Sequence, residues 1–216
     1  MAAPRPTPSR SPFTCELEGY IAGAAFTSGH RFVVGIWEHS PLGPMSDVMW
    51  APPDGERVLL VGREEVGAFI SAVYRFDRVE RRSLETRWHG STLHVDAGDL
   101  EVTLECGRDW SIPLAALRSR GTFRGVEAFV ARRLLGVRTF GTSPTGVFEW
   151  YRADGYRRVV DARATLAGDD LGSLCRFRTP VGFGFSEPPR RPSVVRVRPL
   201  LVDPTGDLAR ALAGHT

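Results

Sequence analysis

The residues best suited to acid–base chemistry lie in one short segment, 37–51, which reads WEHSPLGPMSDVMWA. Glu38 and His39 end an apolar run, and Asp47 follows a loop stiffened by two prolines. Because carboxylates and imidazoles are the common general acids and bases, we predict Glu38, His39 and Asp47 as candidate catalytic residues. Neighbouring strand residues point to opposite faces, so Glu38 and His39 share a pocket only at a β-bulge or a strand end. The alternative is that His39 is a rim histidine bonded to backbone.

A second group of residues suggests ligand binding through aromatic rings. Residues 149–152 read EWYR, and on a strand Trp150 and Arg152 share one face while the glutamate and the tyrosine share the other. A guanidinium beside an indole can hold a planar or anionic ligand, or can simply cover the ring on a sheet surface. Two more indoles flank the acid–base segment. The predicted ligand-binding residues are Trp37, Trp50, Trp150 and Arg152.

The composition excludes several reaction classes. The 216 residues include no Lys, Asn or Gln, so all 28 basic side chains are Arg. A lysine Schiff base, lysine-bound pyridoxal phosphate, and the phosphate-binding lysine of P-loops and kinases are therefore absent. The absence of Asn also removes the Cys-His-Asn arrangement. A very GC-rich genome would produce the same bias.

The sequence predicts neither a metal nor a cofactor. Cys15, Cys106 and Cys175 are widely spaced and form no CxxC pair, which favours three core thiols in a reducing compartment. His89 and His94 are five residues apart, a spacing that matches neither a strand face nor a helix face. Gly182-Phe183-Gly184 lacks the third glycine of a dinucleotide loop.

Charge and hydropathy bear on partners and location. The formal net charge is only +3, and residues 152–216 hold 11 Arg against 7 acidic side chains. This excess could form a surface for anions, but it is too scattered for us to expect nucleic-acid binding. No segment reads as a signal peptide or approaches the roughly 18–20 apolar residues of a membrane helix. We therefore expect a cytoplasmic protein without a membrane partner; its oligomeric state stays open. The candidate anion-surface residues are Arg157, Arg158, Arg190, Arg191, Arg196 and Arg198.

Turn residues and hydrophobic periodicity predict the elements. Pro52–Gly55 and Asp96–Asp99 each join two strand-like runs into a hairpin. Arg63–Tyr74 and Val126–Leu135 carry apolar stripes typical of helices. Residues 179–192, rich in Gly, Pro and Phe, are expected to wrap the outside of a sheet. Further strands are expected at 13–27, 31–38, 137–141, 146–152, 156–166 and 193–201, with a turn at Ala153-Asp154-Gly155 and a short closing helix at 205–213.

These elements predict a mainly β (α+β) fold, an antiparallel β-barrel or half-barrel with two or three helices. We count nine to eleven strands and no β–α–β alternation. Four prolines in residues 1–12 predict a disordered tail, followed by a single domain over 13–216.

One motif resembles a known family. Ser40-Pro41-Leu42-Gly43-Pro44, followed by Asp47 and a strand, is similar to the S-P-x-G-P-x-x-E/D stretch of acetoacetate-decarboxylase-like β-barrel proteins. The resemblance covers about ten residues and implies a barrel around a small-molecule cavity. Those decarboxylases act through a lysine Schiff base, so the resemblance implies altered or absent chemistry here. The whole chain also resembles uncharacterised proteins of GC-rich actinobacteria, which implies no function.

Three functions remain open from the sequence. The first is a binding barrel for a small, largely apolar ligand that can carry an anionic group. The second is a lyase, isomerase or cyclase that uses Glu38, His39 or Asp47 as acid or base, with arginine as anion clamp. The third is an interaction module that uses the basic C-terminal third and the Gly- and Phe-rich loop at 179–192.

Overall fold

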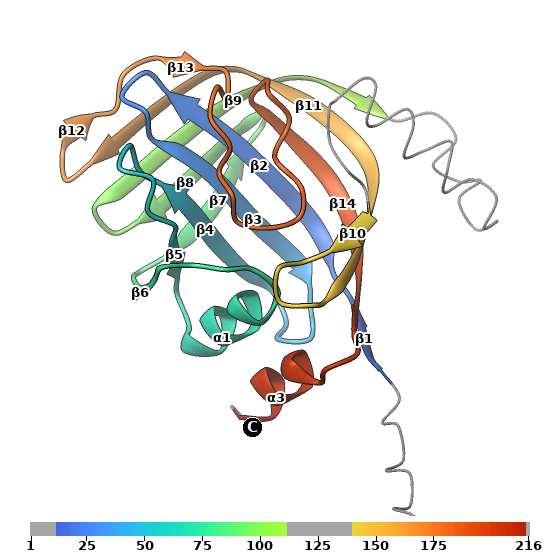
Figure 1. Cartoon of the computed structure of the whole chain (residues 1–216). Coiled ribbons are helices and arrows are strands. Elements are labelled where there is room, and N and C mark those ends of the chain that lie inside the picture. Colours follow the sequence, from blue (N-terminus) through green and yellow to red (C-terminus); the bar gives the residue numbers. More distant parts are fainter. Residues whose placement is uncertain (1–11, 112–139, 215–216) are drawn as a thin grey trace, which may run out of the picture.

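The predicted fold class is confirmed: the described part of the chain is mainly β, an open, curled half-barrel sheet with two helices (Figure 1). The computed structural model describes residues 12–111 and 140–214. The predicted helix Val126–Leu135 and almost all of the predicted tail lie outside the described residues.

Fourteen strands and two helices are described. The helices are α1 (Glu64–Val73) and α3 (Asp207–Ala213). The strands are Phe13–Glu16 (β1), Glu18–Phe26 (β2), Arg31–His39 (β3), Met45–Ala51 (β4), Val58–Val61 (β5), Arg78–Arg81 (β6), Glu85–His89 (β7), Thr92–Ala97 (β8), Leu100–Ser111 (β9), Phe140–Thr142 (β10), Phe148–Leu166 (β11), Asp169–Asp170 (β12), Leu174–Cys175 (β13) and Ser193–Asp203 (β14).

The strands join in the order β6-β5-β4-β3-β2-β14-β11-β9-β8-β7, with the short strands attached at the sides. Both predicted hairpins are confirmed, as β4–β5 and β8–β9. The expectation of no β–α–β unit is wrong in one place, because β5 and β6 pair in parallel and α1 connects them. The sequence of β6, RVER, does not predict a strand, because this edge strand is charged, largely exposed and without an apolar face.

The concave face of the sheet is a packed core. Phe32, Val48, Leu93 and Leu104 are each at most 1 % exposed, although they come from strands near opposite ends of the sheet. The curl is tight enough for the hydroxyls of Ser46 on β4 and Thr86 on β7 to lie 2.9 Å apart. Side chains therefore fill the space around these residues, as in small β-barrels.

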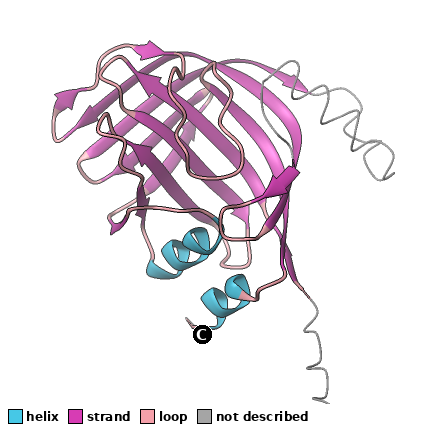
Figure 2. Cartoon of the chain, viewed as in Figure 1, coloured by secondary structure: helices cyan, strands magenta, loops and turns pink. Residues whose placement is uncertain are grey.

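The two helices and a long loop pack in the outer core cluster of the sheet. In Figure 2 the helices lie near the lower end of the sheet and the loop lies across the strands. Helix α1 contributes the predicted stripe of Val66, Phe69 and Ile70, and α3 contributes Leu208. We call residues 176–192 the strap. It crosses β2 and β3 in Figure 1, and it confirms the predicted wrapping loop. The buried Arg31 fixes it, since Nη1 donates to Pro180 O at 2.7 Å.

The predicted turn at Ala153-Asp154-Gly155 is instead a β-bulge inside one 19-residue strand, β11. The register with β14 shifts between Ala153 and Gly155, and pairing continues on both sides. Asp154 is held there by Arg198, whose Nε lies 2.8 Å from its carboxylate. A turn signal became a bulge because the neighbouring strand β14 runs past it and pairs with β11 on both sides.

Candidate functional site

Asp47 is buried on the outer face of the sheet and lies beside a tryptophan. It sits on β4 and is 0 % exposed. Trp37, from the neighbouring β3, donates from its indole Nε1 to Asp47 Oδ1 at 3.0 Å. The other carboxyl oxygen, Oδ2, is buried without a partner among the described residues. The structure thus joins one predicted catalytic residue to one predicted ligand-binding residue.

Gly35 makes room for this pair. It is the β3 residue directly opposite Asp47 in the ladder. A Cβ on Gly35 would lie 2.4 Å from Asp47 Oδ1 and 2.7 Å from Trp37 Nε1. A larger residue at this position would therefore displace the hydrogen-bonded pair.

A second buried carboxyl, Glu149, accepts two tyrosine hydroxyls. Tyr74 follows α1, and its hydroxyl donates to Glu149 Oε2 at 2.6 Å. Tyr151 lies two residues along β11 from Glu149 and donates to the same oxygen at 2.9 Å. The two hydroxyls also contact each other, and the opposite oxygen, Oε1, is buried without a described partner. We call Asp47, Tyr74, Glu149 and Tyr151 the carboxyl–tyrosine cluster.

Burial shifts the ionisation of every member of this cluster. It raises the pKa of Glu149 to about 7, although the two tyrosine hydrogen bonds oppose the shift. It raises the pKa of Asp47 to about 6, against the hydrogen bond from Trp37. Burial, and next the charge of Glu149, raise the pKa values of both tyrosines well above their ordinary value. The Asp47 charge also raises the pKa of Tyr151, as the last of its causes.

The other two predicted catalytic residues lie apart from Asp47. Glu38 and His39 occupy the end of β3 and are exposed. The register with β2 shifts at this point, so the strand end carries the kind of bulge that a shared pocket would need. The two side chains are open to solvent, whereas Asp47 lies beneath the outer layer.

The remaining predicted ligand-binding residues lie elsewhere on the sheet. Trp50 is in the concave core, on the opposite face from Trp37, and its Nε1 donates to His30 Nδ1 at 2.9 Å. Trp150 and Arg152 do share a face, with the guanidinium 5.5 Å from the ring centroid. Arg152 is ion-paired to Glu16 at 2.8 Å. This geometry is that of an arginine covering a tryptophan ring.

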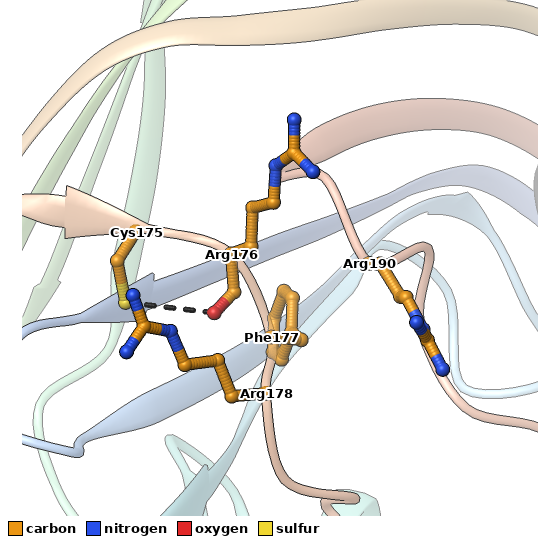
Figure 3. Close-up of a pocket in the computed structure, with 5 residues that line it drawn as sticks. All are labelled: Cys175, Arg176, Phe177, Arg178 and Arg190. Carbon is orange, nitrogen blue, oxygen red and sulfur yellow. Dashed lines mark hydrogen bonds between the residues drawn. The ribbon is translucent and has the colours of Figure 1, made fainter.

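A separate pocket lies where the strap leaves the sheet (Figure 3). Its volume is about 550 Å³. The ring of Phe177 is buried at its centre, and Arg176, Arg178 and Arg190 are exposed around it. The guanidinium groups spread around the ring in Figure 3 and do not converge on one point. We call this the arginine pocket; its lining residues are Cys175, Arg176, Phe177, Arg178 and Arg190.

The arginine pocket carries uncompensated positive charge. Within the described ranges, Arg176, Arg178 and Arg190 take part in none of the ion pairs. Backbone bonds set its shape, because Phe177 N donates to Arg190 O at 3.0 Å and closes the neck of the strap. Unpaired guanidinium groups beside an apolar ring are suited to an anion with an apolar body.

The three cysteines differ in their surroundings. All three are free thiols, and Cys106 is buried. Burial, and next the charge of Asp203, raise the pKa of the Cys15 thiol to about 12. Cys175 is half-exposed in the arginine pocket.

This difference predicts selective labelling. At pH 8 we expect N-ethylmaleimide to modify Cys175 on the order of 100-fold faster than Cys15, because only the thiolate reacts. Peptide mass spectrometry over time would give both rates. Equal rates would contradict the assigned environment of Cys15.

The described residues hold no group of three or more His, Cys, Asp or Glu side chains placed to bind a metal ion. None of the helices in these same ranges is long and apolar enough to cross a membrane.

No family model, curated protein or solved structure matches the chain. The resemblance to acetoacetate-decarboxylase-like proteins therefore stays a prediction.

Sequence reasoning named Asp47 and Trp37 but not their neighbours. The alternation of residues 149–152 predicts Glu149 and Tyr151 on one strand face. The other residues of that face are apolar, and two polar residues on an apolar face are the signal that could have identified them. Tyr74 reaches Glu149 across 75 residues of sequence, and no local pattern reports such a contact. Arg190 was named as a surface residue, whereas Arg176 and Arg178 were missed.

Proposed function

We propose that this protein binds a small anionic ligand with an apolar body, and that the arginine pocket holds it. The observation that carries the proposal is the set of three unpaired arginines around the buried Phe177 ring. The anionic group would bind at the guanidinium rim, and the apolar part would cover the ring. A site outside the sheet is also supported by the concave core, whose described side chains are almost fully buried.

Octyl sulfate tests this proposal, because it joins an apolar chain to a group that stays ionised at all working pH values. We expect calorimetric titration to show binding that weakens as salt is added. The uncharged 1-octanol, with the same chain, should bind much more weakly. Equal affinity for the two would overturn the proposal.

Substitution of one pocket arginine should weaken this binding. Arg178→Gln is expected to raise the Kd for octyl sulfate about fivefold, since one charge-assisted contact at an exposed site is worth about 1 kcal/mol. Arg81→Gln is the matched control, because Arg81 is an exposed arginine on β6 outside the pocket. An equal loss in both variants would show that only the overall charge matters.

Cysteine labelling gives the location of binding. Saturating octyl sulfate should slow maleimide modification of Cys175, which lines the pocket, and should leave the rate of Cys15 unchanged. Native mass spectrometry of freshly purified protein, beside its denatured mass, would reveal any ligand that remains bound. An extra stoichiometric mass would identify it directly.

Acid–base catalysis is the second candidate. It is favoured by one observation, a buried carboxyl with a raised pKa, Glu149, that accepts two tyrosine hydroxyls, with the charge of a second buried carboxyl, Asp47, acting on Tyr151. Metabolite screening would test it: turnover lost in Glu149→Gln and kept in His39→Ala would assign the chemistry to the cluster. The reverse result would assign it to the exposed end of β3.

A further inference from the structure

The far end of the strap rests on the two tyrosines of the carboxyl–tyrosine cluster. Gly184 packs so closely on Tyr74 that a Cβ there would lie 2.7 Å from the ring. The ring of Phe185 lies 6.0 Å from that of Tyr151, centroid to centroid. The backbone N–H of Arg75 donates to Phe183 O at 3.2 Å. The strap therefore covers the residues that hold Glu149.

The other end of the same strap forms the arginine pocket. Phe177 and Arg190 close the neck through the backbone bond described above. Glu187 stiffens the part between, since its carboxylate accepts from Val181 N at 2.7 Å and from Gly182 N at 3.0 Å. The strap thus links the cluster to the pocket through a short loop that Glu187 braces.

Ionised Glu149 has little to compensate its charge. Among the described residues no arginine forms an ion pair with Glu149 or Asp47. The guanidinium of Arg75, near this end of α1, donates to Pro144 O at 2.9 Å. Both tyrosines donate to one oxygen of Glu149, and the other oxygen is buried without a described partner.

The groups around Glu149 come from several elements packed on this part of the outer face. The titratable groups bonded to it are Tyr74 beside α1 and Tyr151 on β11, and the charge of Asp47 on β4 acts on Tyr151. The strap, the strands β10 and β14, and α3 contribute apolar groups, which are Gly184, Phe185, Gly141, Leu201 and Leu208.

We propose that the proton on Glu149 keeps the strap closed on the sheet, and that its loss opens the strap and weakens ligand binding in the arginine pocket. The part of the proposal that concerns binding rests on the proposed function. Opening the strap exposes the carboxylate to water and removes the cost of its burial. The strap is the part that moves, because residues 176–192 contain no helix or strand and its tip lies directly on the tyrosines that hold Glu149.

Binding of octyl sulfate between pH 5.5 and pH 8.5 gives the first test. In the wild type we expect the Kd to rise about tenfold across this range, because binding is linked to one proton. The sulfate group does not titrate there, so the change belongs to the protein. Glu149→Gln, which carries no charge at any pH, should bind with nearly constant affinity. An unchanged wild-type Kd would overturn the coupling.

Tyr74→Phe provides a second variant that keeps the ring under Gly184. It removes a hydrogen bond that lowers the pKa of Glu149, so the midpoint of the binding curve should move to higher pH. A purely structural role for Tyr74 would weaken binding equally at every pH. This variant keeps the proposal testable if Glu149→Gln folds poorly.

Hydrogen exchange measures the opening without any ligand. At pH 8, peptides from residues 178–188 should exchange faster in the wild type than in Glu149→Gln, while peptides from β8 and β9 exchange alike in both. Comparison at one pH removes the intrinsic dependence of exchange on hydroxide.

The combination of readouts separates the two proposals. Faster strap exchange without octyl sulfate binding would overturn the proposed function and support the switch. Binding with equal strap exchange in the two proteins would support the function and overturn the switch.

Discussion

Between pH 4.5 and pH 8 the wild type is expected to lose stability, and Glu149→Gln is expected to lose about 3 kcal/mol less of its free energy of unfolding. The folded protein holds the Glu149 proton up to a pKa of about 7, whereas the unfolded chain releases it near 4.5. Between these values the folded state binds more protons, so stability is greatest at low pH and falls as pH rises.

Urea denaturation at a series of pH values would measure this effect. Glu38→Gln is the matched control, since Glu38 is an exposed glutamate on β3, and it should follow the wild-type curve. Asp47, with a pKa of about 6, contributes a loss of the same sign, so part of the dependence remains in Glu149→Gln. If the strap opens at high pH, the Glu149 carboxylate reaches water and its burial costs less. The difference of about 3 kcal/mol between Glu149→Gln and the wild type is then an upper value. Parallel curves for Glu149→Gln and the wild type would contradict the buried position of Glu149.

Gly35→Ala is expected to lower the free energy of unfolding by about 3 kcal/mol. The added methyl would lie well inside contact distance of Asp47 Oδ1 and Trp37 Nε1, so their hydrogen bond must break or the ladder between β3 and β4 must shift. Either response leaves a buried polar group without its partner, which is among the most destabilising changes.

Gly62→Ala is the control for Gly35→Ala. A Cβ there would meet its nearest atom, in Leu84, at an ordinary 3.6 Å, so we expect a change of less than about 1 kcal/mol. Thermal unfolding of the two variants beside the wild type would give both values, and the emission of Trp37 would report the broken bond. Equal stability of Gly35→Ala and the wild type would show that the sheet adjusts at no cost.

Local patterns were sufficient for the elements whose form depends on near neighbours. The apolar run of β3, the stripe of α1 and the turn at Pro52–Gly55 all appear as predicted. Gly55 adopts a φ of 90°, which glycine allows without strain. Side-chain periodicity and turn chemistry act over a few residues, so they can be read from the sequence.

The sequence by itself therefore determined the mainly β class, the outer position of the strap, and the exclusion of every lysine-dependent reaction. Only the tertiary structure decided that Asp47 meets Trp37 beneath the outer layer, that Tyr74 reaches Glu149, and that Asp154 sits in a bulge. It also decided which arginines surround Phe177 without an acidic partner. The physical reason is the same in each case: strand order and register bring together residues far apart in the chain, and the burial that shifts a carboxyl's pKa exists only after those strands have paired.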